Sequence, residues 1–364
     1  MTWHCPVDRT ALEVVTRAEA EARLGSHLAP TDRVGRAPVG ATERVAISNA
    51  WAYPVVADIP VLLVPERLFP GGEGPPADVT KPPYAEAYSE MDPYSAASDL
   101  ETNTPSIRAE VERLERRREM VGSGQANFPD PVELWMAPGD EFTAQLHAMR
   151  HLAPVRDRRV LQVGGNGWHA VSMLAAGAGE ATVISPVLDE LRLCARVATD
   201  AGLADRLNLA CAIAEELPIE DHTMDLVYSP ASMHHTVTER SFPEIARVLA
   251  SDGRFASVDV FRSPLYDTGI KMFGKKEANV WCKPLDRDRL APSSVLPGVE
   301  LSFHGSLFRY PLAIATRRGR NVNPQWFTRL TKAEDAIARV VPGVRRLASL
   351  VCVTADASRQ PSSP

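Results

Sequence analysis

The sequence predicts an α/β fold: a doubly wound, mostly parallel seven-stranded sheet, with a small β-rich N-terminal domain and helical lid insertions. Residues 158–262 alternate short apolar stretches with helical patterns, which is typical of a parallel sheet with crossover helices. The first apolar stretch runs straight into three glycines, and the flanking segments differ from it in composition. We therefore expect an N-terminal domain, a linker with a helical lead-in, a ligand-binding core, and a final part with insertions and C-terminal strands. Their predicted bounds are 1–68, 69–150, 151–262 and 263–357.

The first predicted strand begins at Arg159 and ends in the sequence Gly164-Gly165-Asn166-Gly167, after which an alanine-rich helix follows. Glycines let the backbone adopt positive φ angles and approach a ligand without an intervening Cβ. The amides at the start of the helix favour an anionic group. A strand, a glycine loop and a helix in this order are typical of nucleotide-type sites in doubly wound proteins.

More strands follow in the order that such a sheet requires. Helical patterns separate them, the clearest being residues 189–201 and the run that begins at Glu244 and ends before Gly253. The further predicted strands are 181–186, 207–213, 224–229, the stretch after Gly253, 299–305 and 346–356.

The segments AEELPIEDHTMDLVYS (214–229) and EIARVLASDGRF (244–255) carry a family resemblance. Together with the glycine loop they resemble class I S-adenosylmethionine-dependent methyltransferases, in the branch related to quinone and sterol methylation. The resemblance implies an enzyme that transfers a methyl group from S-adenosylmethionine to a small molecule. It places the cofactor at Gln162, Gly164, Gly165, Asn166, Gly167, Ser185, Ala214, Glu215 and Ser229.

The chain departs from this family at three customary carboxylates. Gln162 stands where the glycine loop is usually preceded by an acid, and the other two acids would fall at Val183 and Ile213. Losing acceptors for a ribose diol costs about 1–3 kcal/mol each if nothing replaces them. Nearby polar groups that could do so are Gln162, Ser185, Asp189 and Glu215. Either the cofactor is held differently, or the fold is a non-catalytic scaffold or regulatory partner, or it runs different chemistry.

His234 and His235 follow the fourth strand and are the predicted catalytic residues. Ligands of open α/β sheets lie beyond the carboxyl ends of the strands, and a histidine there can take a proton near neutral pH. The alternative is structural, because the second histidine resembles a family residue that caps the next helix. Two adjacent histidines seldom bind one metal ion without further donors, so we expect no metal.

Residues 264–320 contain ten Lys or Arg and five Asp or Glu, a surplus of +5 in a chain whose net charge is −6. This asymmetry favours an anionic or polar substrate held by basic side chains. A solvated basic surface is the alternative. The predicted substrate-binding residues are Lys275, Lys276, Glu277, His304, Arg309 and Tyr310.

Residues 1–68 resemble the small zinc-ribbon-like domain of the tRNA-methyltransferase activator family. The segment from Tyr53 to Leu63 fits its closing motif, but Asp8 stands where the second metal-binding cysteine belongs. A structural zinc needs four nitrogen or sulfur ligands, so we expect this domain to bind none. It would either dock on the catalytic domain or serve only as a stabilising cap.

Composition limits the remaining possibilities. The negative net charge argues against general nucleic-acid binding, and five scattered cysteines are typical of a reducing compartment. No apolar run approaches 18 residues and the N-terminus lacks a signal-peptide pattern. We therefore expect a cytoplasmic protein with a small-molecule substrate, no nucleic-acid or membrane partner, and a possible homo-oligomeric state.

Overall fold

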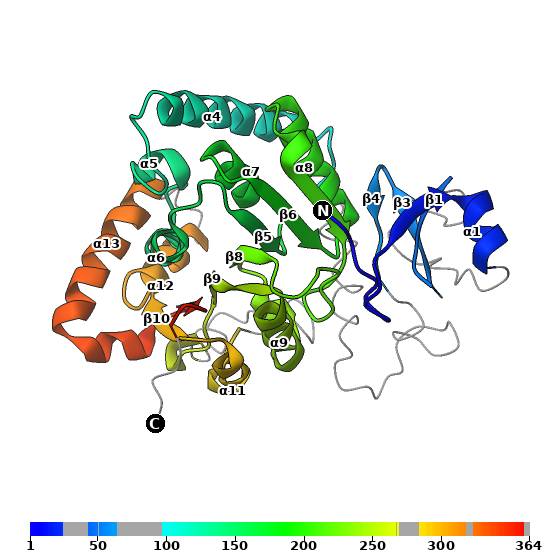
Figure 1. Ribbon diagram of the computed structural model, residues 1–364. Helices are drawn as coiled ribbons and strands as arrows, with labels where there is room; N and C mark the ends of the chain where they lie inside the picture. The colour runs from blue at the N-terminus through cyan, green and yellow to red at the C-terminus, as the bar shows by residue number, and fades with distance from the viewer. Residues whose placement is uncertain are drawn as a thin grey trace.

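The computed structural model describes residues 1–24, 43–49, 51–63, 97–266, 268, 284–317 and 323–359 (Figure 1). Its centre is a seven-stranded sheet in the order β10-β11-β9-β8-β5-β6-β7. Only β11 runs antiparallel to its neighbours, so the sheet is mostly parallel, as predicted. The strands are β5 (Arg159–Val163), β6 (Glu180–Ser185), β7 (Leu207–Cys211), β8 (Met224–Pro230), β9 (Leu249–Val260), β10 (Glu300–His304) and β11 (Leu350–Asp356).

Helices cover both faces of this sheet. Figure 1 shows α4 (Thr104–Gly122), α7 (Trp168–Ala175) and α8 (Leu188–Asp200) on one side, and α9 (Thr238–Val248) and α11 (Arg287–Leu290) on the other. The remaining helices are α5 (Val132–Trp135), α6 (Phe142–Leu152), α12 (Arg309–Arg317) and α13 (Pro324–Val340), with short 3₁₀ turns η3 (Ala204–Arg206), η4 (Met233–His235), η5 (Ala291–Val295) and η6 (Pro342–Leu347).

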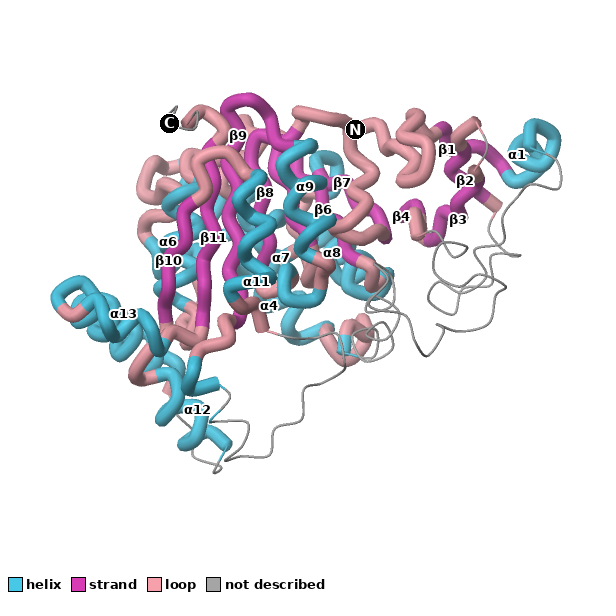
Figure 2. The backbone as a smooth tube through the Cα atoms, turned by 90° about the horizontal axis from the view of Figure 1, so that it is seen from below, coloured by secondary structure: helices cyan, strands magenta, loops and turns pink. Residues whose placement is uncertain are grey.

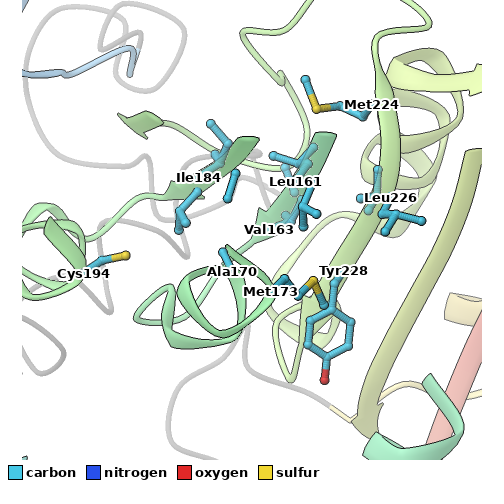
Figure 3. Close-up of a cluster of buried hydrophobic side chains, with 14 of the residues drawn as sticks. Leu161, Val163, Ala170, Met173, Ile184, Cys194, Met224, Leu226 and Tyr228 are labelled. Atoms are coloured by element: carbon cyan, nitrogen blue, oxygen red, sulfur yellow. The ribbon is translucent and has the colours of Figure 1, made fainter. Parts of the chain in front are cut away.

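The core between β5, β6, β8 and α7 is continuous and apolar. Figure 3 shows Leu161, Ile184 and Met173 among its side chains. At Gly167 the φ angle is +76°, and a Cβ there would lie 2.4 Å from the Sγ of Cys194. Glycine is therefore required at this position for the start of α7 to pack against α8.

Several predicted boundaries were wrong. The strand predicted at 207–213 ends at Cys211, and the one predicted at 346–356 begins at Leu350. The helix predicted from Glu244 to before Gly253 ends at Val248, and β9 begins at Leu249. The reason is strand pairing, because Leu249 is the register partner of Met224 in β8.

The N-terminal part forms its own antiparallel sheet in the order β1-β2-β3-β4, from β1 (Glu13–Thr16), β2 (Arg44–Ile47), β3 (Ala52–Val56) and β4 (Ile59–Pro60), with α1 at Arg17–Leu24. Immediately after β4, Val61 bridges Cys211 in the outer strand β7, and the N–H of Leu62 donates to the carbonyl of Cys211 at 2.7 Å. Val61, Leu62 and Leu63 are buried in the main core. This segment therefore covers the open edge of the large sheet.

Cys5 and Asp8, which stand where the resembling family has zinc-binding cysteines, take part in hydrogen bonds within the protein. The Sγ of Cys5 lies 3.2 Å from the hydroxyl of Tyr53, and Asp8 accepts from the hydroxyl of Ser48 at 3.0 Å. Among the described residues, no group of three His, Cys, Asp or Glu is arranged to hold a metal ion. Within the same residues, no helix has the length and apolar character needed to cross a membrane.

Candidate cofactor pocket and catalytic residues

A pocket opens where β5, β6, β7 and β8 end. Each strand contributes the residues that directly follow it, so the pocket lies at the carboxyl edge of the sheet. This is the edge at which doubly wound proteins bind ligands. The lining includes Gly164 and Gly165, then Ser185 to Val187 with Glu190, then Ala212 to Glu215, and finally Pro230 to Ser232 with His235 and Thr236.

The glycine loop forms one wall of this pocket. Gly164 and Gly165 have φ angles of +82° and +68°. A Cβ on Gly164 would lie 2.2 Å from the Oγ of Ser232, so no larger residue fits between the two loops. Both glycines therefore present backbone without side chains to the pocket.

Gln162 does not line the pocket; its side chain stabilises the glycine loop through hydrogen bonds. Its side chain is buried, its Nε2 donates to the carbonyl of Gly164 at 2.9 Å, and its Oε1 accepts the N–H of Ala170 at 2.8 Å. A carboxylate could accept from Ala170 but could not donate to Gly164. The amide at this position therefore fixes the geometry of the loop.

Three other predicted cofactor residues also lie outside the pocket lining. Asn166 accepts the N–H of Trp168 at 3.3 Å, and Gly167 packs against Cys194. Ser229 is buried, and its hydroxyl has no hydrogen-bond partner among the described residues.

Glu190 is a carboxylate that lies beside the end of β6. It lies in the first turn of α8, lines the pocket, and accepts a hydrogen bond from the Oγ of Ser185 at 2.8 Å. The neighbouring Asp189, which the sequence suggested as a substitute acid, instead pairs with Arg192 at 3.2 Å. Val183, the expected place of the family's acid, is fully buried within the strand, which ends two residues later at Ser185.

Ala214 and Glu215, which the sequence suggested as cofactor-binding residues, line the pocket from the segment after β7. An oxygen of Glu215 accepts the N–H of Val237 at 2.7 Å, at the start of α9. The carboxylate of Glu215 therefore links the segment that follows β7 to the segment that follows β8.

The two histidines occupy different positions. His235 lines the pocket, whereas His234 is buried behind it. The Nδ1 of His234 lies 2.9 Å from Oδ1 of Asp259, at the end of β9, and the two imidazole rings are 3.9 Å apart. Arg289 donates to the carbonyls of His234 and Thr236, which holds this turn in place. Sequence reasoning missed Asp259, whose position beside His234 depends on the pairing of β8 with β9.

The predicted substrate residues that the structure describes are engaged elsewhere. Arg309 donates to Asp140 at 2.7 Å and to the Oγ of Ser349 at 3.1 Å. The hydroxyl of Tyr310 lies 2.6 Å from that of Ser263, and burial raises the pKa of Tyr310.

His304, on the outer strand β10, interacts with neighbouring polar side chains. Its Nε2 lies 2.9 Å from the Oγ of Ser302, and its Nδ1 lies 3.4 Å from Asp335. Lys275, Lys276 and Glu277 lie outside the described residues.

Known proteins resemble the part of the chain that forms the pocket. The family described as "Methyltransferase domain" matches residues 161–257. Uncharacterized methyltransferases from Mycobacterium tuberculosis and Mycobacterium bovis are 31% identical over 114 residues, which is 30% of this chain and 43% of each relative. The chain thus aligns with less than half the length of these curated relatives.

Solved structures resemble a larger part of the chain. One is a geranyl diphosphate C-methyltransferase from Streptomyces coelicolor A3(2), with 14% identity and a TM-score of 0.44, covering 59% of this chain and 78% of that one. Another is a putative sarcosine dimethylglycine methyltransferase from Galdieria sulphuraria, with 16% identity and a TM-score of 0.43, covering 61% and 86%. The family match covers residues 161–257, which include the glycine loop and the strands β6, β7 and β8 of the seven-stranded sheet.

Proposed function

We propose that this protein is an S-adenosylmethionine-dependent methyltransferase that acts on a small anionic or polar molecule. The main support for this proposal is the pocket at the ends of β5 to β8. Two positive-φ glycines at the end of β5 share it with Glu190, within a segment that matches a methyltransferase domain. Bound S-adenosylmethionine supplies a methyl group activated by its sulfonium.

The pocket residues fit the parts of this cofactor. Glu190 and Ser185 present oxygen acceptors at the end of β6, which suits the hydroxyl groups of a ribose. Ile184 and Ile213 give the same pocket apolar walls, which suit the flat face of a purine. Glu190 thus takes the role of the carboxylate that is absent from the usual position.

His235 is the residue that we assign to proton uptake from the acceptor, because it lines the pocket beyond β8. His234 stands behind it as a positioning residue. Its contact with Asp259 favours the proton on Nδ1 and fixes the orientation of the ring. Base catalysis of this kind contributes about 10²–10⁴ in rate, and positioning supplies much of the rest.

The anionic or polar character of the substrate rests on the basic surplus of residues 264–320. Arg309 is bound to Asp140, so it serves as a link between α12 and the start of α6. Lys275 and Lys276 are therefore the better residues for testing the charge of the substrate. Replacing both with glutamine should raise the substrate's apparent KM more than it lowers kcat.

Calorimetric titration with S-adenosylmethionine tests the proposal. The wild-type protein should bind it, and Gly165→Val should weaken binding by at least about tenfold because the side chain would enter the pocket. Gly124→Val is the matched control, since Gly124 has a φ angle of +74° and no neighbour within 4 Å of an added Cβ. Absence of binding by the wild-type protein at millimolar cofactor would contradict the proposal and favour the scaffold alternative.

A further inference from the structure

Helix α13 is amphipathic in the reverse of the usual sense. Among the side chains of this helix that the structure describes, the buried ones are Thr328, Thr331, Glu334 and Ala338, and three of these four are polar. Glu334 accepts the N–H groups of Leu307 and Phe308 at 2.7 and 2.8 Å, just before α12. The helix is therefore held to the protein by polar contacts on its inner side.

Large apolar side chains lie on its outer side. Trp326, Val340 and Val341 are 55%, 82% and 51% exposed, and Ile337 is 40% exposed. These residues, here called the apolar stripe, make up four of the nine large hydrophobic side chains that are exposed in the described part of the chain. Positions 11 and 14 residues after Trp326 return to nearly the same side of an α-helix, so Trp326, Ile337 and Val340 share one face, and Val341 follows directly after the end of the helix.

Basic side chains accompany the stripe. Residues 323–347 contain five Lys or Arg and two Asp or Glu, one of which is the buried Glu334, in a chain with a net charge of −6. Arg329 lies over the Trp326 ring at 5.9 Å. Within the described part of the chain, no salt bridge is formed by the five cations, which are Arg329, Lys332, Arg339, Arg345 and Arg346. Lys332 lies over the ring of Phe142 in α6 at 4.9 Å, and Arg339 and Arg345 line a hollow beside β10.

The position of the helix makes this face accessible. Figure 2 shows α12 and α13 at the margin of the molecule, beyond the outer strand β10 and away from the N-terminal sheet. The pocket at the ends of β5 to β8 is formed by other residues. The stripe is thus separate from the proposed cofactor site.

We propose that α13 and η6 rest on an anionic lipid surface, with the apolar stripe in the headgroup region and the cations against lipid phosphates. Apolar side chains on one face flanked by Lys and Arg are the chemistry of helices that lie in a membrane interface. A second copy of the chain fits less well, because a symmetric contact through the stripe would place two segments with the same positive surplus, five cations against two acids, next to each other. The proposal revises the expectation of no membrane partner, which considered only segments that span a bilayer.

Sedimentation with lipid vesicles tests this proposal on the full chain. Wild-type protein should pellet with vesicles that contain phosphatidylglycerol and much less with phosphatidylcholine alone. Val340→Asp should reduce the partition coefficient at least about tenfold, and the double variant Arg345→Gln, Arg346→Gln about thirtyfold. Val295→Asp is the matched control, because Val295 is 47% exposed on η5 and should bind like wild type.

Two results would overturn the proposal. One is a failure of the wild-type protein to pellet with phosphatidylglycerol vesicles at low salt. The other is an equal loss in Val295→Asp and Val340→Asp. Sedimentation velocity without lipid identifies the other occupant, since a dimer that Val340→Asp dissociates would assign the stripe to a second copy.

Discussion

Asp259 holds His234 by two contacts from a single carboxylate oxygen. Oδ1 accepts the backbone N–H of His234 at 3.1 Å and lies 2.9 Å from its Nδ1, and both residues are buried. A buried hydrogen bond to a charged group is worth more than an exposed one because water does not compete for it. The pair therefore fixes the turn that follows β8 and the imidazole within it.

A double-mutant cycle should measure this coupling. We expect His234→Ala and Asp259→Ala to show an interaction free energy of about 1–3 kcal/mol in urea unfolding. The exposed pair of Asp189 and Arg192 is the control and should couple by about 0.5 kcal/mol or less. Equal coupling in the two cycles would mean that the buried contact does not orient His234.

Replacing Gln162 with glutamate should destabilise the protein even though it restores the acid that is usual at this position. The carboxylate keeps the bond from Ala170 but faces the carbonyl of Gly164 without a proton to donate. An unsatisfied buried acceptor costs about 1–3 kcal/mol. Calorimetric unfolding at pH 7 checks this, and a Gln162→Glu variant as stable as wild type would refute it.

Glu190→Gln should weaken binding of S-adenosylhomocysteine by about tenfold, because the amide has one acceptor oxygen where the carboxylate has two. Asp189→Asn is a close control. Asp189 is adjacent in sequence but pairs with Arg192 outside the pocket lining. If both variants bind equally, the ribose is held by some other group.

His169 should make the protein less stable in mild acid. Burial, followed by the charges of Arg117 and Arg113, lowers the pKa of His169 to about 4. In the unfolded chain it returns to about 6.5, so between these values the unfolded state binds more protons. The free energy of unfolding should therefore fall as pH decreases from about 6.5 to 4, by on the order of 3 kcal/mol from this residue.

The comparison of wild type with His169→Gln isolates that contribution. Urea unfolding at pH 7 and pH 4.5 should show a smaller pH dependence in the variant. His169 also contacts the ring of Tyr228 at 5.3 Å, so the variant is compared with itself at the two pH values. An unchanged difference between pH 7 and pH 4.5 would show that His169 is not kept neutral.

The strands were predictable because their signals are local. The stretch 224–229 became β8 (Met224–Pro230), and the glycine loop took the positive φ angles that its residues suggested. Gly164 and Gly165 line the pocket, and their binding of the cofactor stays a prediction. The resemblance of residues 1–68 to an activator subunit and the quinone-related branch remain predictions.

Contacts between distant residues could not be predicted in this way. Arg309 meets Asp140 across 169 positions of sequence, so its surplus charge looked available for a substrate. The end of β6 was predicted to within one residue, but which of the adjacent acids Asp189 and Glu190 faces the pocket depends on how α8 packs. Which face of α13 is exposed depends on the contact of Glu334 with the backbone of Leu307, and the sequence does not show that contact.

A crystal structure of the protein soaked with S-adenosylhomocysteine would show directly whether the pocket at the ends of β5 to β8 holds the cofactor. We expect electron density for the nucleoside between the loop of Gly164 and Gly165 and the segment from Ala212 to Glu215, with the ribose hydroxyls facing Glu190. We also expect the sulfur to face the turn that carries His235. Density at another site, or none in a crystal with an open pocket, would contradict the assignment of this pocket as the cofactor site.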